Sequence, residues 1–161
     1  MADKEFVKSF LRDHELCKAL TPKEIDIFLE FTQEIEFSKG ETIADIGDVG
    51  DALYIVLSGE VVLLADDGSD ELEVGRMRQG ELAGEMSFFD RQPRMLRMRA
   101  VKDGTQLLKL TREMYKRMRV EHAYIVVNLL EFAIVSLDHL VRRQSSDVAT
   151  FTRYLYGKGK K

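Results

Sequence analysis

Between residues 41 and 110 the chain alternates short apolar runs with turns rich in glycine and aspartate. The runs show a period of two, which is typical of β-strands. In turns such as residues 47–51 and 66–70, glycine supplies positive φ and aspartate bonds its own backbone. Short strands spaced by roughly 8–12 residues predict an α+β fold built on a β-roll (jelly roll) of about eight antiparallel strands over residues 32–110. The strands expected here are 41–45, 52–57, 60–65, 71–77, 96–101 and 105–110.

Residues 1–31 are predicted to form helices that precede the roll. The apolar residues that share one face of a first short helix are Phe6, Val7, Phe10 and Leu11. A second helix begins with Thr21 as its N-cap and Pro22 at its first position, and Glu24 completes a capping box. We expect this helix to end near Phe31.

Residues 111–143 are predicted to form C-terminal helices, the second running from about His122 to Arg143. This second helix has more apolar stripes than docking on one roll requires. One stripe is Val126, Leu130, Ala133, Leu137 and Leu140, and another is Val127, Leu130, Ile134, Leu137 and Val141. Either the rest of the domain covers them all, or helix 122–143 forms a homodimer, which we expect. Residues 144–161 are predicted to be a frayed tail.

The composition is that of one soluble domain of 161 residues with a net charge of -4, so no overall basic charge attracts nucleic acid. The single Cys17 excludes an internal disulfide and fits a reducing compartment. The charged N-terminus is unlike a signal peptide, and the apolar-rich stretch from Tyr124 to Leu130 is too short to span a bilayer. We therefore expect a cytoplasmic protein without a membrane partner.

Residues 80–94 contain the types of group that hold an anionic sugar. Gly84 lets the backbone approach a ligand, because it has no Cβ. A short helix over residues 86–89 would point its N-terminal N–H groups at a phosphate. Arg94 offers a planar fork for two phosphate oxygens, and Glu85 can accept a hydrogen bond from a ribose hydroxyl.

This segment resembles the phosphate-binding cassette of cyclic-nucleotide-binding domains, as in protein kinase A regulatory subunits and bacterial catabolite activator proteins. Glu85 follows Gly84, and eight residues separate it from Arg94, as in the kinase form. Residues 47–51 and 53–60 resemble the first turn and strand pair of that family. The resemblance implies a regulatory domain with a cassette over residues 80–95 that binds a cyclic nucleotide, with cAMP favoured over cGMP. It also implies a signal that passes through the C-terminal helix to an effector protein.

By this resemblance, Glu85 takes the ribose 2′-hydroxyl and Arg94 the cyclic phosphate, and nearby backbone N–H groups support them. The ligand-binding residues implied are Leu82, Ala83, Gly84, Glu85, Met86, Ser87, Arg94 and Met95. The final helix normally folds over the base, so Leu140, Val141 and Arg142 are candidate lid residues.

Two residues depart from the family pattern, which has small side chains after the arginine. Met95 is expected to crowd the pocket, and Leu96 to add volume to the core. Strand alternation places Leu96, Met98 and Ala100 inside the roll and Arg97 and Arg99 outside. Two hypotheses stay open: a nucleotide sensor, or an orphan scaffold that binds a protein partner without nucleotide.

Neither catalysis nor direct DNA binding is expected. Metal-dependent jelly-roll enzymes need two or more histidines on strands, whereas His14, His122 and His139 all fall in predicted helices. We expect no enzymatic activity, metal or cofactor. Catabolite activators carry a helix-turn-helix after the long helix, and the residues that follow Arg143 are too few for one.

Overall fold

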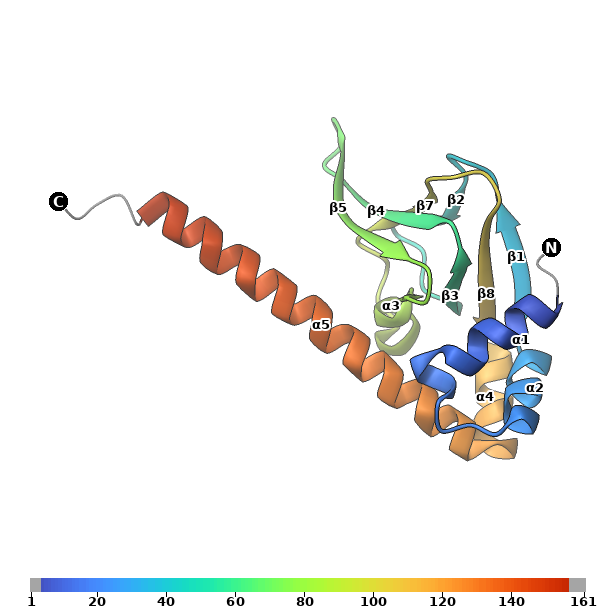
Figure 1. The fold of residues 1–161 in the computed structure, drawn as a ribbon. Helices are drawn as coiled ribbons and strands as arrows, with labels where there is room; N and C mark the ends of the chain where they lie inside the picture. The colour runs from blue at the N-terminus through green and yellow to red at the C-terminus, as the bar shows by residue number, and fades with distance from the viewer. Residues whose placement is uncertain (1–3, 157–161) are drawn as a thin grey trace.

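Two four-stranded antiparallel sheets face each other and form a β-roll, with helices at one end (Figure 1). The computed structural model describes residues 4–156. One sheet has the order β1-β8-β3-β6 and the other β2-β7-β4-β5, which confirms the predicted roll of eight antiparallel strands. The strands are β1 Gln33–Phe37, β2 Thr42–Ala44, β3 Ala52–Ser58, β4 Glu60–Asp66, β5 Glu71–Arg78, β6 Leu82–Ala83, β7 Arg97–Ala100 and β8 Thr105–Thr111. The helices are α1 Lys4–Asp13, η1 Glu15–Cys17, α2 Pro22–Glu30, α3 Glu85–Asp90, α4 Arg112–Glu121 and α5 Ala123–Tyr156.

Strand β3 is buried along almost its whole length, because each of its faces packs against a different core. Ala52, Tyr54 and Val56 face the interior of the roll. The alternate residues, Leu53, Ile55 and Leu57, face the helices. The continuous apolar run in the sequence therefore reflects a strand shared by two cores.

The N-terminal helices form as predicted. Val7 and Leu11 of α1 are buried in the helical core. The capping box of α2 is complete, because Glu24 N–H donates to the Thr21 hydroxyl and Thr21 N–H donates to the Glu24 carboxylate. This end of the domain also buries Cys17, and burial raises the pKa of its thiol to about 12.

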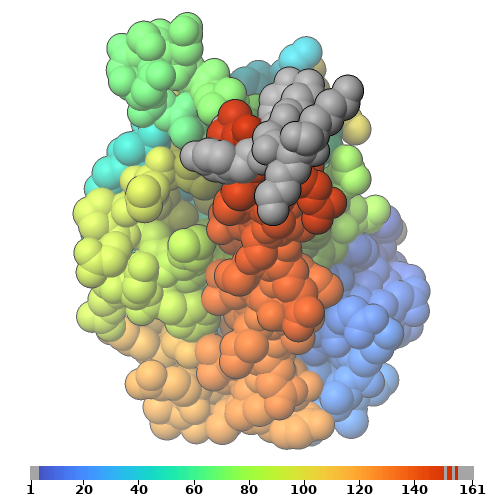
Figure 2. Space-filling view, turned by 90° about the vertical axis from the view of Figure 1, so that its left-hand side faces the viewer, coloured from blue at the N-terminus to red at the C-terminus, as the bar shows by residue number. Residues whose placement is uncertain are grey.

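Helix α5 is longer than the sequence analysis predicted. It continues through residues 144–156, so the prediction of a frayed tail from residue 144 is wrong for this part; residues 157–161 lie outside the described part of the chain. The apolar stripes weaken after residue 143, but no glycine or proline occurs between Gly104 and Gly157, and nothing else breaks the helix. Figure 1 shows its last turns projecting beyond the roll, and Figure 2 looks at the side towards which they project.

By length and composition alone, α5 is apolar enough to cross a membrane between Ala123 and Thr150, with a mean hydropathy of 1.7 in its most apolar window. Its first turns, however, bury Ile125, Val126 and Leu129 in the core of the domain. This packing accounts for the apolar residues of the first turns, whereas 22% of the apolar window is buried in the domain and most of its apolar side chains are half-buried or exposed.

Candidate functional site

The cassette is a strand, a tight turn and one short helix. Strand β6 ends at Ala83, Gly84 takes a left-handed conformation with φ +85°, and α3 follows directly. A Cβ at Gly84 would lie 3.2 Å from Ala52 O and 3.4 Å from the Arg94 guanidinium, so glycine serves both the turn and the close approach. The helix expected over residues 86–89 is confirmed as Glu85–Asp90.

The loop between β2 and β3 is locked onto this cassette. Gly50 N–H donates to the Ser87 hydroxyl at 2.7 Å, and that hydroxyl donates to Gln92 O at 2.6 Å. Arg94 N–H donates to Asp48 O at 2.8 Å, and its carbonyl accepts from Gly47 N–H at 2.9 Å. These bonds fix the backbone of Arg94. The Ser87 hydroxyl, which was expected to contact the ligand, instead bonds two backbone groups and holds the loop on the cassette.

Arg94 is buried without a carboxylate partner. Its side chain is only 8% exposed, yet it forms no ion pair with any residue from 4 to 156. The hydrogen bond recorded for its guanidinium is a long contact of 3.8 Å from Nη1 to the Met98 sulfur. Because a buried charge without a partner is costly, this guanidinium is suited to receive an anion.

Glu85 lies near Arg94 but is not bonded to it. Glu85 is 5% exposed, and burial raises the pKa of its carboxyl; its own backbone N–H and the charge of Arg94 partly oppose that rise. The two charged groups therefore keep separate hydrogen-bonding capacity, one for an anion and one for a hydroxyl.

Tyr54 is a site residue that the sequence analysis missed. It faces the roll from β3, pairs with Ala83 across the sheet, and its ring lies 3.4 Å from the position of a Cβ on Gly84. Burial raises the pKa of its hydroxyl, and Arg94 is close enough to oppose that rise. Strand alternation could have predicted this position, because Tyr54 lies between Ala52 and Val56 on the face of β3 that points into the roll.

The other predicted ligand-binding residues do not all face the interior of the roll. Ala83 faces the roll, but Leu82 points into the helical core, so only one of the two expected wall residues lines the roll. Met86 is exposed on α3. Met95 is 84% exposed, so the prediction that it crowds the pocket is wrong; it lies in the bend before β7, where the side chain turns to solvent.

The basic residues beyond Arg94 lie mostly on the outer face of the roll. Met98 and Ala100 are buried inside, as alternation predicted, whereas Leu96 is only half-buried because it precedes β7. On the outside, Arg97 pairs with Asp45 at 2.7 Å and Arg99 with Glu71 at 2.9 Å. The groups of three or more histidine, cysteine or acidic side chains that would suggest a metal site do not occur within residues 4–156.

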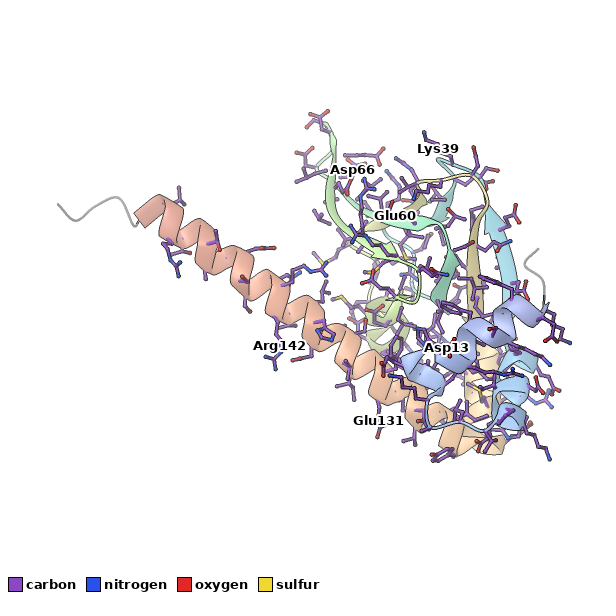
Figure 3. The ribbon with its side chains drawn as sticks, viewed as in Figure 1. Asp13, Lys39, Glu60, Asp66, Glu131 and Arg142 are labelled. Carbon is purple, nitrogen blue, oxygen red and sulfur yellow. The ribbon has the colours of Figure 1, made fainter. Side chains whose placement is uncertain are left out.

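The candidate lid residues do not cover the roll in this structure. Leu140 is half-buried, whereas Val141 and Arg142 are exposed. Arg142 pairs with Asp138 of the same helix at 2.6 Å, and Figure 3 shows it on the side of α5 that faces away from the roll. A lid formed by these residues would therefore require α5 to move.

Comparisons with known proteins agree with this geometry. The sequence model of one family, the cyclic nucleotide-binding domain, matches residues 34–122. The cyclic AMP receptor protein of Thermus thermophilus is 39% identical over 106 residues, which are 65% of this chain and 49% of the relative. A cAMP-dependent protein kinase regulatory subunit of Emericella nidulans is 33% identical over 111 residues, which are 69% of this chain and 26% of the relative.

Among solved structures, a cyclic nucleotide-binding domain from Methylobacillus flagellatus has the same fold. It superposes with a TM-score of 0.79 at 20% identity and covers 92% of this chain and 83% of that one. The chain thus spans about half or less of the two sequence relatives, whereas it matches nearly the whole of this solved domain.

The burial of Glu85 predicts a pH-dependent cost to stability. A raised folded-state pKa means that the folded protein holds the proton more tightly, so stability falls as pH rises from the unfolded pKa through the folded one. Glu85→Gln removes this cost. The variant should therefore unfold at a higher temperature than the unsubstituted protein at neutral pH, with the gain disappearing at about pH 4.

Thermal unfolding of the ligand-free protein across this pH range measures the effect. Glu131→Gln, at an exposed position on α5 (Figure 3), is the matched control and should show no such trend. A Glu85→Gln variant that is less stable at neutral pH would contradict the account.

Proposed function

Because the chain belongs to the cyclic nucleotide-binding domain family, we propose that it is a regulatory sensor that binds a cyclic nucleotide inside the β-roll and signals through α5. The single observation that carries this proposal is Arg94, a buried guanidinium that has no carboxylate partner among residues 4–156. Such a charge is stabilised when an anion enters the site.

The proposed binding mode assigns one chemical group to each side chain. Arg94 bonds the two exocyclic oxygens of the cyclic phosphate, with bidentate geometry. Glu85 accepts from the ribose 2′-hydroxyl, and the backbone N–H groups at the start of α3, around Gly84 to Met86, add donors to the phosphate. Tyr54, whose ring lies beside Gly84, forms part of the wall. The site is buried, which strengthens each of these electrostatic contacts.

We propose cAMP as the preferred ligand over cGMP. The printed names of both sequence relatives refer to cyclic AMP. The side chain of Met95 points to solvent. The outward Met95 also means that this residue leaves room for a nucleotide.

The exposed face of α5 supports a homodimer. Five large apolar side chains recur at seven-residue intervals: Val127, Ile134, Val141, Val148 and Leu155. Leu130 and Leu137, three residues after the first two, complete the a and d positions of a heptad pattern. Branched residues at a with leucine at d favour two parallel strands, so we propose that a second copy of this chain covers the stripe.

This dimer extends the expected interface beyond helix 122–143 to Leu155. We propose that the ligand changes the position of α5, and that an effector protein in the cytoplasm reads the change. One observation favours the alternative function, a scaffold that binds a protein without nucleotide: α5 carries an exposed apolar stripe, which a protein partner could cover.

Calorimetric titration of the purified protein with cAMP, cGMP and cyclic di-GMP tests the ligand. We expect stoichiometric binding of cAMP that weakens roughly 30-fold or more in Arg94→Ala, because truncating one partner of a buried charge pair costs about 2–5 kcal/mol. Glu85→Ala should weaken binding as well.

Arg99→Ala is the matched control, since Arg99 is paired with Glu71 on the outer face, and it should bind like the unsubstituted protein. The sensor proposal fails if the folded protein binds none of the three nucleotides. It also fails if the Arg94→Ala variant binds the nucleotide as tightly as the unsubstituted protein does.

Sedimentation equilibrium tests the dimer. We expect a mass twice that of the 18.5 kDa chain, and a monomer for Ile134→Asp, because a charge at an a position cannot be buried between two helices. Ser146→Asp changes the opposite face of α5 and should stay dimeric. A monomeric unsubstituted protein would contradict the proposal.

A further inference from the structure

His14 is a buried polar residue that the binding site does not use. It lies between α1 and η1 and is 9% exposed. Its Nδ1 accepts from Leu16 N–H at 3.2 Å, so the proton of the neutral ring lies on Nε2. Nε2 donates to Gly80 O at 2.6 Å, across 66 residues of sequence. The imidazole is thus held at both nitrogens by backbone groups.

Gly80 is the first residue of the cassette segment. It has a φ of +86°, and its N–H donates to Val56 O of β3 at 2.8 Å. A Cβ at this position would be 3.5 Å from the His14 ring, so the imidazole packs directly on the turn. The backbone runs from this turn through β6 to Gly84 and Glu85, so a shift of the cassette acts on the His14 bond.

The other side of the His14 ring contacts α5. Phe132 meets it edge-on with ring centroids 4.9 Å apart, and Phe10 of α1 lies 5.4 Å away. Phe132 lies on the opposite side of α5 from the stripe of Val127, Ile134 and Val141. Figure 3 shows Asp13, which immediately precedes His14, at the end of α1, and η1, which follows His14, contacts α5.

We infer that His14 is a positioning residue that couples the cassette turn at Gly80 to α5 through Phe132. This inference rests on the proposed function and names the route by which the site and the helix influence each other. The His14 ring donates a hydrogen bond to Gly80 O, where the cassette begins, and packs on Phe132 of α5. Displacement of Gly80 O moves the ring, and the ring moves Phe132.

Coupling between two sites is reciprocal, so a change in α5 must alter nucleotide affinity by the same route. Phe132→Ala should therefore change the Kd for cAMP, by about fivefold or more for a typical allosteric coupling. The effect should depend on which His14 nitrogen is retained, because Nε2 bonds the cassette and Nδ1 bonds only η1.

Two substitutions separate the nitrogens. In His14→Asn, the side-chain oxygen replaces Nδ1 as the acceptor for Leu16 N–H, but the side chain is too short to reach Gly80. In His14→Gln, the amide nitrogen replaces Nε2 as the donor to Gly80 O. Lys8→Ala is the control, because it breaks the Lys8–Asp26 pair between α1 and α2 without touching the cassette.

The experiment measures the effect of Phe132→Ala on the Kd for cAMP in each background. We expect the full effect in the unsubstituted and Lys8→Ala proteins, a reduced effect in His14→Gln, which keeps the donor to Gly80 O but loses the ring that packs on Phe132, and less than about a twofold effect in His14→Asn. An equal effect in His14→Asn would overturn the inference, because a merely structural histidine would lower stability without changing this difference.

Hydrogen exchange of the ligand-free proteins gives an independent result. Phe132→Ala should speed exchange of the amides from Gly80 to Gly84 in the unsubstituted protein, and should add nothing in His14→Asn. If no protein binds nucleotide, the proposed function fails, but this exchange difference still tests the coupling. If Phe132→Ala leaves the exchange of these amides unchanged, the coupling is absent whatever the nucleotide result.

Discussion

Strand β3 divides this domain into two cores that share one wall. Its residues alternate between the roll, where Tyr54 lies, and the helical layer, where Leu53 and Ile55 lie. The cassette pairs with this strand through β6 and divides in the same way, with Ala83 towards the roll and Leu82 towards the helices. Because both cores are closely packed, a change on the ligand side of this wall is felt on the helix side. The interior of the roll and the helical layer that includes the first turns of α5 therefore pack on opposite faces of the same strand.

The electrostatics of the site follow from the same burial. The backbone of Arg94 is fixed by bonds to Asp48 and Gly47, and its side chain extends beside Gly50 and Gly84, where any Cβ would intrude. Glu85 is held close by without pairing to it, and burial raises the pKa of its carboxyl. A site with one unpaired cation and one costly carboxylate is most stable when a ligand supplies an anion and a hydroxyl.

Local patterns in the sequence predicted local structure well. The capping box at Thr21 and Glu24 and the short helix after Gly84 were found where expected, because each depends on neighbours within a few residues. The burial of Arg94 depends on Gly47, Asp48 and Gly50, which are distant in sequence, and was not predicted. Met95 was placed wrongly because its expected place in the pocket rested on its position after Arg94 in the family pattern, whereas in the structure it lies in a bend that turns its side chain to solvent. The length of α5 was underestimated because fading apolar stripes do not stop a helix that lacks glycine and proline. His14 could not be interpreted at all, since Gly80 and Phe132 are close to it only in the folded chain.

We propose above all that the guanidinium of Arg94 binds the phosphate of a cyclic nucleotide. The most direct measurement is the NMR resonance of the Arg94 Nε–H group during titration with cAMP and, separately, with adenosine, which lacks the phosphate. The account predicts a saturable shift with cAMP and no comparable shift with adenosine, because only the phosphate supplies an anion. A resonance that saturating cAMP leaves unchanged, or that adenosine moves equally, would contradict it.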